Sequence, residues 1–297
     1  MVSTPVEIPS DFEFMSWFTF TLLAVVVFSA YSIFIRIFLA DRGDAQTFAL
    51  LLNASMAVFL LGVLAPLTGL RADLSVGTVV WVGIASCFYA LASTLITWAR
   101  QLEEASKVSV TRQTGAIWVF AGGIFVLDER LTIGKIIGTT LVVLGTILAT
   151  WDQEGIRPSK GLMMILAGVF IGSASSLIGK TVVETSLSPA LYAGSRALIA
   201  AMLLTIFLPD VRTRARQEIS LQQLRIPAVG LLLGLNFFLL YKALEIGDAS
   251  SVRPVFGSAT ILTVAAAILF LGERDRILQK IIGAAFVVAG VVLFRMI

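Results

Sequence analysis

Long apolar runs alternate with short polar connections along the whole chain. A helix that crosses a bilayer needs about 20 predominantly apolar residues, and ten runs of about this length follow one another. They cover residues 17–39, 46–69, 76–99, 106–127, 132–151, 160–184, 189–208, 226–245, 250–271 and 277–296. The connections carry most of the charges, and the longest is residues 209–225. The pattern predicts an all-α membrane protein with ten transmembrane helices.

The composition supports this interpretation and excludes several other classes. The chain is 58% apolar and 14% charged, whereas soluble domains carry about 25% charged residues; the mean hydropathy is +0.94. It has one cysteine and no histidine, so it lacks an internal disulfide as well as the commonest general base and metal ligand. The net charge of +3 is better explained by loops that set membrane orientation than by nucleic-acid binding. We therefore expect no enzymatic activity, no bound cofactor or metal, and no nucleic-acid partner.

The chain repeats itself after 144 residues. The phrase LDERLTIGKIIG begins at Leu127, and LGERDRILQKIIG begins at Leu271. The repeat predicts two five-helix units, residues 1–152 and 153–297. Because five is odd, the second unit enters the bilayer from the opposite face, which gives two inverted five-helix repeats. A duplication kept only for packing is the alternative, but inverted repeats of this kind more often build transporters.

The order of these motifs resembles the drug/metabolite transporter superfamily, EamA type. DER follows the fourth predicted helix and GER follows the ninth, while GSRALIAAMLL (194–204) and ASSVRPVFGSATILTVAAAILFLGER (249–274) are similar to the family's seventh and ninth helices. The resemblance implies export or exchange of small metabolites, often amino acids, drugs or sugar derivatives. Where the seventh helix has Arg196, the corresponding part of the second helix has only Asn53. The fourth helix carries Arg112 and has no proline that corresponds to Pro254 in the ninth. The two halves are therefore not expected to bind a ligand alike.

Among the Lys and Arg within the predicted spans, five are considered as candidates for buried charges: Arg36, Arg112, Lys180, Arg196 and Lys242. A charge at a helix centre costs about 2.5–3.5 kcal/mol on insertion scales. We expect Arg36, Lys180 and Lys242 to snorkel, since each lies near a helix end. Arg112 and Arg196 lie farther in, about 10 Å from the helix end at a rise of about 1.5 Å per residue. We predict that these two line a cavity that attracts a carboxylate or phosphate; the alternative is a hydrogen bond to helix-end carbonyls.

Polar and aromatic side chains on other helices complete the predicted substrate site. Asn236 lies mid-helix, where an amide needs an interhelical partner or a ligand. The other residues that we predict in the site are Tyr31, Asn53, Tyr89, Ser93 and Tyr241. A mainly apolar pocket with a few polar groups suits a zwitterionic or amphiphilic metabolite.

Together these features predict a secondary transporter that exports or exchanges amino-acid-like metabolites by alternating access. The chain has no phosphate-binding GxxxxGK[ST] loop, so we do not expect ATP to drive it. It also has no mid-helix carboxylate, so a proton relay is not required. The alternatives are a drug or nucleotide-sugar-like exporter of the same fold and, from another class, a membrane scaffold or sensor that transports nothing.

The charges also predict where the protein lies. We expect a multi-pass protein of the plasma membrane, monomeric or homodimeric, in contact with the lipid bilayer and a small-molecule substrate. With the termini outside, 12 of the 22 Lys and Arg would lie in cytoplasmic loops, as the positive-inside rule requires. The family resemblance implies cytoplasmic termini instead; we follow the charges.

Overall fold

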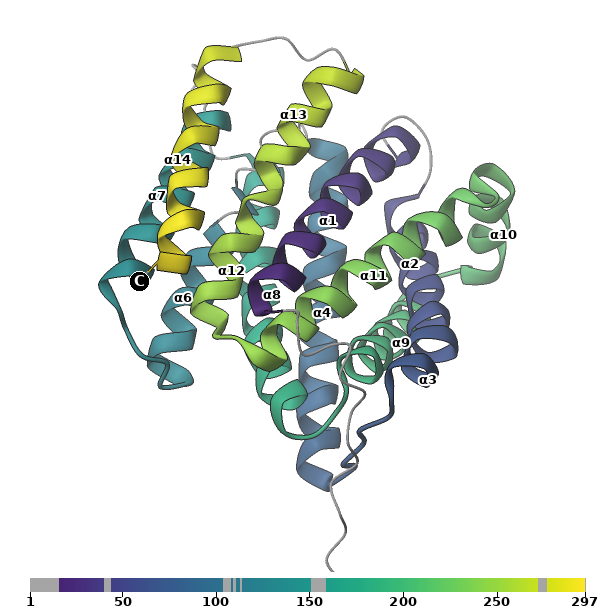
Figure 1. The fold of residues 1–297 in the computed structure, drawn as a ribbon. Helices are drawn as coiled ribbons and strands as arrows, with labels where there is room; N and C mark the ends of the chain where they lie inside the picture. The colour runs from purple at the N-terminus through teal and green to yellow at the C-terminus, as the bar shows by residue number, and fades with distance from the viewer. Residues whose placement is uncertain are drawn as a thin grey trace, which may run out of the picture.

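The computed structural model of the chain describes residues 16–39, 44–103, 108, 111–112, 114–150, 159–271 and 277–296. Its first half contains α1 (Trp17–Leu39), α2 (Ala45–Phe59), the π-helical turn η2 (Leu60–Leu64), α3 (Ala65–Thr68), α4 (Val76–Leu102), α6 (Thr114–Val126) and α7 (Ile133–Thr150). Its second half contains α8 (Lys160–Thr185), α9 (Pro189–Phe207), α10 (Val211–Gln222), α11 (Arg225–Ile246), α12 (Ala249–Gly257), α13 (Ala259–Leu271) and α14 (Ile277–Met296). Apart from one isolated bridge, Ala72 to Leu187, no β-structure occurs in these residues. The all-α class is confirmed (Figure 1).

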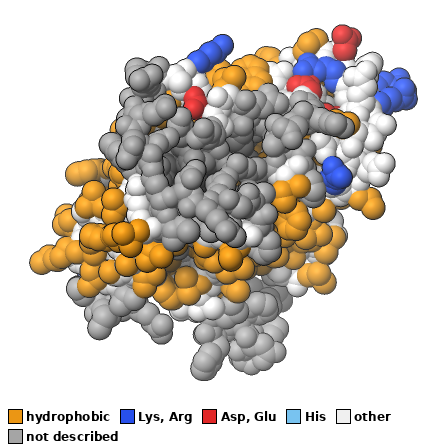
Figure 2. All heavy atoms as spheres, turned by 90° about the horizontal axis from the view of Figure 1, so that it is seen from above, with side chains coloured by type: hydrophobic (Ala, Val, Ile, Leu, Met, Phe, Trp, Pro, Cys, Tyr) orange, Lys and Arg blue, Asp and Glu red, His pale blue; other side chains and the backbone are white. Residues whose placement is uncertain are grey.

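Six helical segments are long and apolar enough to cross a membrane: 17–35, 45–68, 76–99, 160–185, 189–207 and 225–246. Three further apolar stretches, 114–126, 133–145 and 281–290, are shorter. Figure 2 shows the end at which α10 lies: hydrophobic side chains cover the flanks, while Lys and Arg gather toward one edge. Large exposed apolar side chains, such as Val58, Phe125 and Phe207, are what a surface in contact with lipid requires.

The packing of the helices is symmetric between the two halves. A shift of 144 residues relates α1 to α8, α2 to α9, α4 to α11, α6 to α13 and α7 to α14. α1 packs on α11 as α8 packs on α4, and α1 contacts α13 as α8 contacts α6. The related helices α2 and α9, and α7 and α14, pack directly against each other. Exchanging the two halves therefore leaves these principal contacts unchanged.

Related helices also run in opposite directions. The Gln279 side chain, at the start of α14, donates to the carbonyl of Leu148, at the end of α7, over 2.7 Å. Ser188 N–H, just before α9, donates to the carbonyl of Arg71, just after α3, over 2.8 Å. The two repeats are thus inverted relative to each other, as the odd number of helices in each repeat predicts. At Gly145, an added Cβ would lie 2.6 Å from the carbonyl oxygen of Gly283, so α7 and α14 approach each other backbone to backbone.

Ion pairs join the two halves at the end of the bundle where α1 begins, called the α1 end below. Arg71 lies 2.9 Å from Glu245, and Lys135 lies 2.6 Å from Asp248. In each pair the cation belongs to the first half and the carboxylate to the second. These bonds close the α1 end across the boundary between the repeats.

Glu129, from the repeated DER phrase, adds a helix cap at the same end. Its two carboxylate oxygens accept from the backbone N–H groups of Ala249 at 2.7 Å and Ser250 at 2.9 Å. These donors lie in the first turn of α12, where the helix itself supplies no acceptor and its dipole favours an anion. Glu129 of this phrase therefore joins the end of the fourth predicted helix to the start of the ninth. The second copy of the phrase lies outside the described residues.

The expectation that Lys180 snorkels is wrong. Its side chain is buried, and Nζ donates to Glu184 at 2.6 Å and to the carbonyls of Leu244 and Gly247 at 3.3 and 3.0 Å. Those carbonyls lie at the C-terminal end of α11, where a cation satisfies groups that the helix leaves free. Lys242 pairs with the carboxylate one turn along its own helix, and the side chain of Arg36 lies outside the described residues.

Two predicted continuous helices are interrupted. The ninth breaks at Ser258 into α12 and α13, four residues after Pro254, which lies inside α12. The second contains η2 just before Pro66. Proline lacks an N–H and its ring meets the carbonyl four residues earlier. For Pro66 that residue is Gly62, within η2, so the proline explains the π-helical turn; the break at Ser258 lies on the C-terminal side of Pro254 and is not explained in this way. The connection 209–225 is itself largely helical, as α10.

Candidate functional site

Arg196 lies in the middle of the bundle, on a helix made mostly of small and apolar residues. Pro189 occupies the first turn of α9, where proline is tolerated. At Gly194, an added Cβ would lie 2.7 Å from the side chain of Leu61, so α9 packs closely on the π-helical turn η2. The Arg196 side chain is only 1% exposed. A guanidinium held so deep needs partners that lower the cost of removing it from water.

Aromatic rings supply most of those partners. The Arg196 guanidinium carbon lies 3.9 Å from the ring centre of Tyr89 and 4.4 Å from that of Phe237. The rings of Tyr241 and Tyr192 follow at 5.1 and 5.7 Å, and Nη1 donates to the Tyr241 hydroxyl over 2.6 Å. Cations are attracted to aromatic faces, by about 2 kcal/mol or more where water is excluded. These four rings form the aromatic cage of Arg196.

The guanidinium nevertheless keeps two nitrogens free. Among the described residues, Nε and Nη2 of Arg196 have no hydrogen-bond partner, although both atoms are buried. Buried donors without a partner are rare, and they call for an explanation such as a bound water or a ligand. The aromatic cage therefore stabilises the charge of Arg196 without satisfying its hydrogen bonds.

Further cations and rings adjoin the cage. Arg112 lies over the ring of Phe28 at 5.0 Å, and Phe28 lies 5.7 Å from Tyr31. Tyr89 interacts electrostatically with both Arg112 and Tyr31. Arg253, on α12, donates through Nη2 to Ser176, while its Nε is buried without a partner among the described residues. The site thus combines side chains from both repeats.

Three residues predicted for the site have partners elsewhere. Asn236 donates to the carbonyl of Ala24 on α1 over 2.8 Å, which is the interhelical partner that a mid-helix amide requires. Asn53 donates to the carbonyl four residues before it at 2.8 Å, and Ser93 donates to the carbonyl three residues before it at 3.0 Å. None of these bonds joins the aromatic cage of Arg196.

Comparison with known proteins identifies the fold and the family. The sequence profile of the EamA-like transporter family matches residues 15–151 and again residues 159–296, nearly the whole chain in two copies. The chain belongs to the EamA-like transporter family. A solved structure titled only "Crystal structure of protein" is similar in fold, with a TM-score of 0.72 at 18% identity over 94% of this chain and 98% of that chain. A search of curated proteins found no significant match.

Membership in the EamA-like family makes this chain an integral, multi-pass membrane protein of a transporter family, and the predicted resemblance is confirmed. The cage lies where such a transporter needs a site, between two inverted repeats. All four tyrosines of the chain, Tyr31, Tyr89, Tyr192 and Tyr241, belong to the cage or adjoin it. Their scarcity in a chain with 20 phenylalanines is the signal that could have revealed Tyr192.

Sequence reasoning missed other parts of the site in this EamA-like protein. Arg253, which lies within α12, was not among the predicted site residues. Phe237 and Ser176 stand among many similar residues, so no sequence signal distinguishes them. No cluster of three His, Cys, Asp or Glu that could hold a metal occurs in the described part of the chain.

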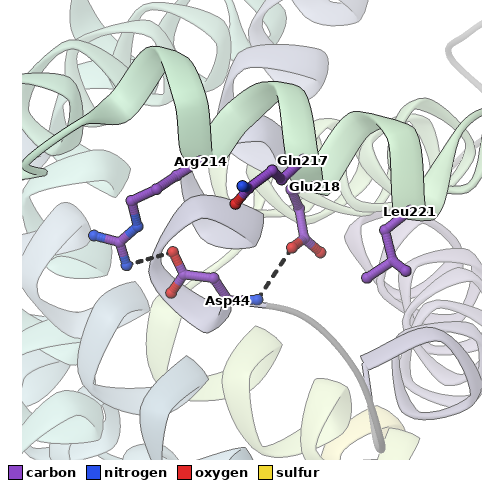
Figure 3. A pocket seen from close by; sticks show the side chains of 5 residues that line it. All are labelled: Asp44, Arg214, Gln217, Glu218 and Leu221. Carbon is purple, nitrogen blue, oxygen red and sulfur yellow. Dashed lines mark hydrogen bonds and ion pairs between the residues drawn. The ribbon is translucent and has the colours of Figure 1, made fainter.

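A separate surface pocket of about 390 Å³ lies far along the bundle, beside α10 (Figure 3). It is lined by Asp44, Arg214, Gln217, Glu218 and Leu221. Arg214 pairs with the Asp44 carboxylate, and Glu218 accepts from the Asp44 N–H at 3.0 Å. These bonds fasten α10 to the start of α2, so the pocket is explained by the docking of α10.

Proposed function

We propose that this EamA-like protein is a secondary transporter that exports or exchanges small metabolites bearing a carboxylate, the amino-acid-like class among them. The observation that carries the proposal is the buried Arg196, whose two free nitrogens lie within a cage of aromatic rings. A guanidinium binds carboxylates through paired hydrogen bonds, and a largely apolar site with few polar groups is typical of small-molecule binding. We infer ten membrane crossings, with the shorter apolar helices completing the two sets of five.

The inverted repeats support a mechanism of alternating access. Two similar halves of opposite direction give the protein two arrangements of similar energy, each open to one side. At the α1 end, the ion pairs of Arg71 and Lys135 and the cap by Glu129 join the halves. We infer that these bonds break when the site opens toward that end, and that they form again when the site opens toward the other end.

Counterflow in proteoliposomes tests the proposal. A panel should include amino acids, organic acids, drugs and nucleotide sugars, with and without a pH gradient. We expect a carboxylate-bearing metabolite to exchange without the gradient. Arg196→Lys should reduce that exchange at least tenfold, because lysine keeps the charge but loses the planar pair of donors. Arg212→Gln, at an exposed position on α10, is the control for lost positive charge.

The remaining outcomes separate the alternatives. Exchange of drugs or nucleotide sugars alone would favour the other kind of exporter. Failure of every compound to exchange or to raise the unfolding temperature of the purified protein would favour a scaffold, since a transporter is stabilised by its cargo.

Fusions to fluorescent protein and to phosphatase at Ile297 test the termini, which we propose lie outside at the plasma membrane. Fluorescence from the C-terminal fusion would place that terminus in the cytoplasm and overturn this orientation.

A further inference from the structure

The free edge of Arg196 restricts the shape of what binds there. Nη1 is used by Tyr241, and the ring centres of Tyr89 and Phe237 lie 3.9 and 4.4 Å from the guanidinium carbon. Nε and Nη2, the two nitrogens without a partner in the described structure, lie on the same edge of the planar group. Two parallel N–H groups on one edge match the two oxygens of a carboxylate. A ligand group therefore has to approach in the plane of the guanidinium, as a carboxylate does.

Among the described residues, no carboxylate lies at the centre of the bundle. Within the described membrane-crossing helices, Asp and Glu occur only in a final turn, as Glu184 in α8 and Glu245 in α11. Glu245 lies one turn beyond Tyr241 and already pairs with Arg71 and Lys242. The counter-charge for the buried cations has to come from the ligand, since neither carboxylate extends to the cage.

More than one cation is left to be neutralised. Arg253 lies beside the cage: its Nη2 donates to Ser176, next to Ser175, whose carbonyl accepts from the Tyr192 hydroxyl at 3.4 Å. The buried Nε of Arg253 is a second free donor among the described residues. Like charges near one another repel strongly where water is excluded. A single carboxylate would neutralise only one of them, and an ammonium group would add positive charge without a carboxylate to receive it.

We propose that the preferred substrate of this site is a small organic dianion, with a dicarboxylate as the simplest example, rather than the zwitterionic amino acid of the same skeleton. The first carboxylate binds the Nε–Nη2 edge of Arg196, and the second anionic group is neutralised by Arg253. This inference rests on the transport function proposed above and narrows its substrate class.

Matched pairs of substrates isolate the ammonium group. Succinate and aspartate, and glutarate and glutamate, differ only by one amino group, and propionate serves as the monoanion. At neutral pH all of their carboxyl groups are ionised. The assay is competition in counterflow, with radiolabelled succinate and aspartate as tracers. Each dicarboxylate should inhibit exchange of the tracer at a concentration at least about tenfold lower than its amino counterpart, because an ammonium left unpaired in a buried site costs at least that factor.

Substitution of Arg253 tests the second anionic group. Arg253→Gln keeps hydrogen-bonding groups but removes the charge, so it should lower the advantage of succinate over propionate by about tenfold while affecting propionate little. The ratio within one variant does not depend on how much protein folds. Arg212→Gln, with the same change of charge on exposed α10, should leave the ratio unchanged.

The results distinguish failure of the dianion proposal from failure of the proposed transport function. If the amino acid of either pair competes as well as the dicarboxylate, or if neutral metabolites exchange while none of these acids does, the dianion proposal is overturned and transport stands. If no compound of either panel exchanges, the transport function is contradicted as well.

Discussion

Glu129 offers the sharpest test of closure at the α1 end. Its carboxylate accepts two backbone hydrogen bonds, at 2.7 and 2.9 Å, from the first turn of α12. A hydrogen bond to a charged group contributes about 1.5–3 kcal/mol, so the pair contributes about 3–6 kcal/mol before water replaces the lost acceptor. We expect Glu129→Ala to favour opening of this end by about 3 kcal/mol, which is roughly a hundredfold in the equilibrium.

A cysteine at Ser250 reports that opening. Ser250 is fully buried beside the cap, and the single native cysteine, Cys87, is exposed. In a Cys87→Ser background, Ser250→Cys should react slowly with a thiol reagent in detergent. Glu129→Ala should raise the reaction rate ten- to hundredfold, whereas Glu129→Gln, which keeps one acceptor oxygen, should raise it less.

The neighbouring carboxylate supplies the control. Asp128 is exposed with a φ of 52°, a conformation that asparagine also tolerates. Asp128→Asn removes the adjacent charge but no cap, and should leave the labelling rate unchanged. Equal rates for Glu129→Ala and Asp128→Asn would refute the reasoning, because the cap would then contribute nothing to closure.

Three further substitutions test the packing. Gly145→Ala should lower the unfolding temperature, because the added Cβ would meet the α14 backbone at 2.6–2.8 Å. Gly83→Ala, where an added Cβ has nothing within 4 Å, should raise the unfolding temperature slightly, because it removes glycine flexibility worth about 0.5–1 kcal/mol. An equal effect at both sites would contradict the close approach of α7 and α14. Asn236→Leu should destabilise by about 0.6–1.7 kcal/mol, the range for hydrogen bonds between membrane helices, as measured by reversible unfolding in mixed micelles, and greater stability would show that its bond to α1 is dispensable. Lys180→Met, which leaves the α11 carbonyls without their donor, should accelerate hydrogen exchange at the end of α11, and unchanged exchange there would mean that the lysine does not cap that helix.

The sequence was sufficient to predict the all-α class and the antiparallel course of the related helices, because both follow from strong signals; ten membrane crossings stay a prediction. Apolar runs of bilayer length admit few structures, and a repeat with an odd number of helices implies inversion. Arg196 was identifiable for the same reason, since a charge in the middle of an apolar helix is costly. Tyr89 and Tyr241 were also predicted, and the structure places both in its cage; their role in binding stays a prediction.

Predictions failed where a long side chain or a ring has several possible partners. Lys180 lies near a helix end by sequence, but the carbonyls that it binds belong to α11 and are distant in the chain. Ser93 and the amide nitrogen of Asn53 donate to carbonyls of their own helices, and a polar residue in a sequence does not reveal such a local partner. Arg253 was not predicted in the site because it lies in the first turn of the predicted helix 250–271, where a long cationic side chain is expected to extend to the membrane surface.

The gathering of all four tyrosines has a practical consequence for spectroscopy. Biosynthetic replacement of tyrosine by 3-fluorotyrosine would introduce four fluorine nuclei without any mutation, all in or beside the rings around Arg196. Every resonance in the ¹⁹F spectrum would then come from one neighbourhood, so that occupancy of the centre and its exchange between states become directly visible. A chain with tyrosines spread over its loops would give no such native reporter.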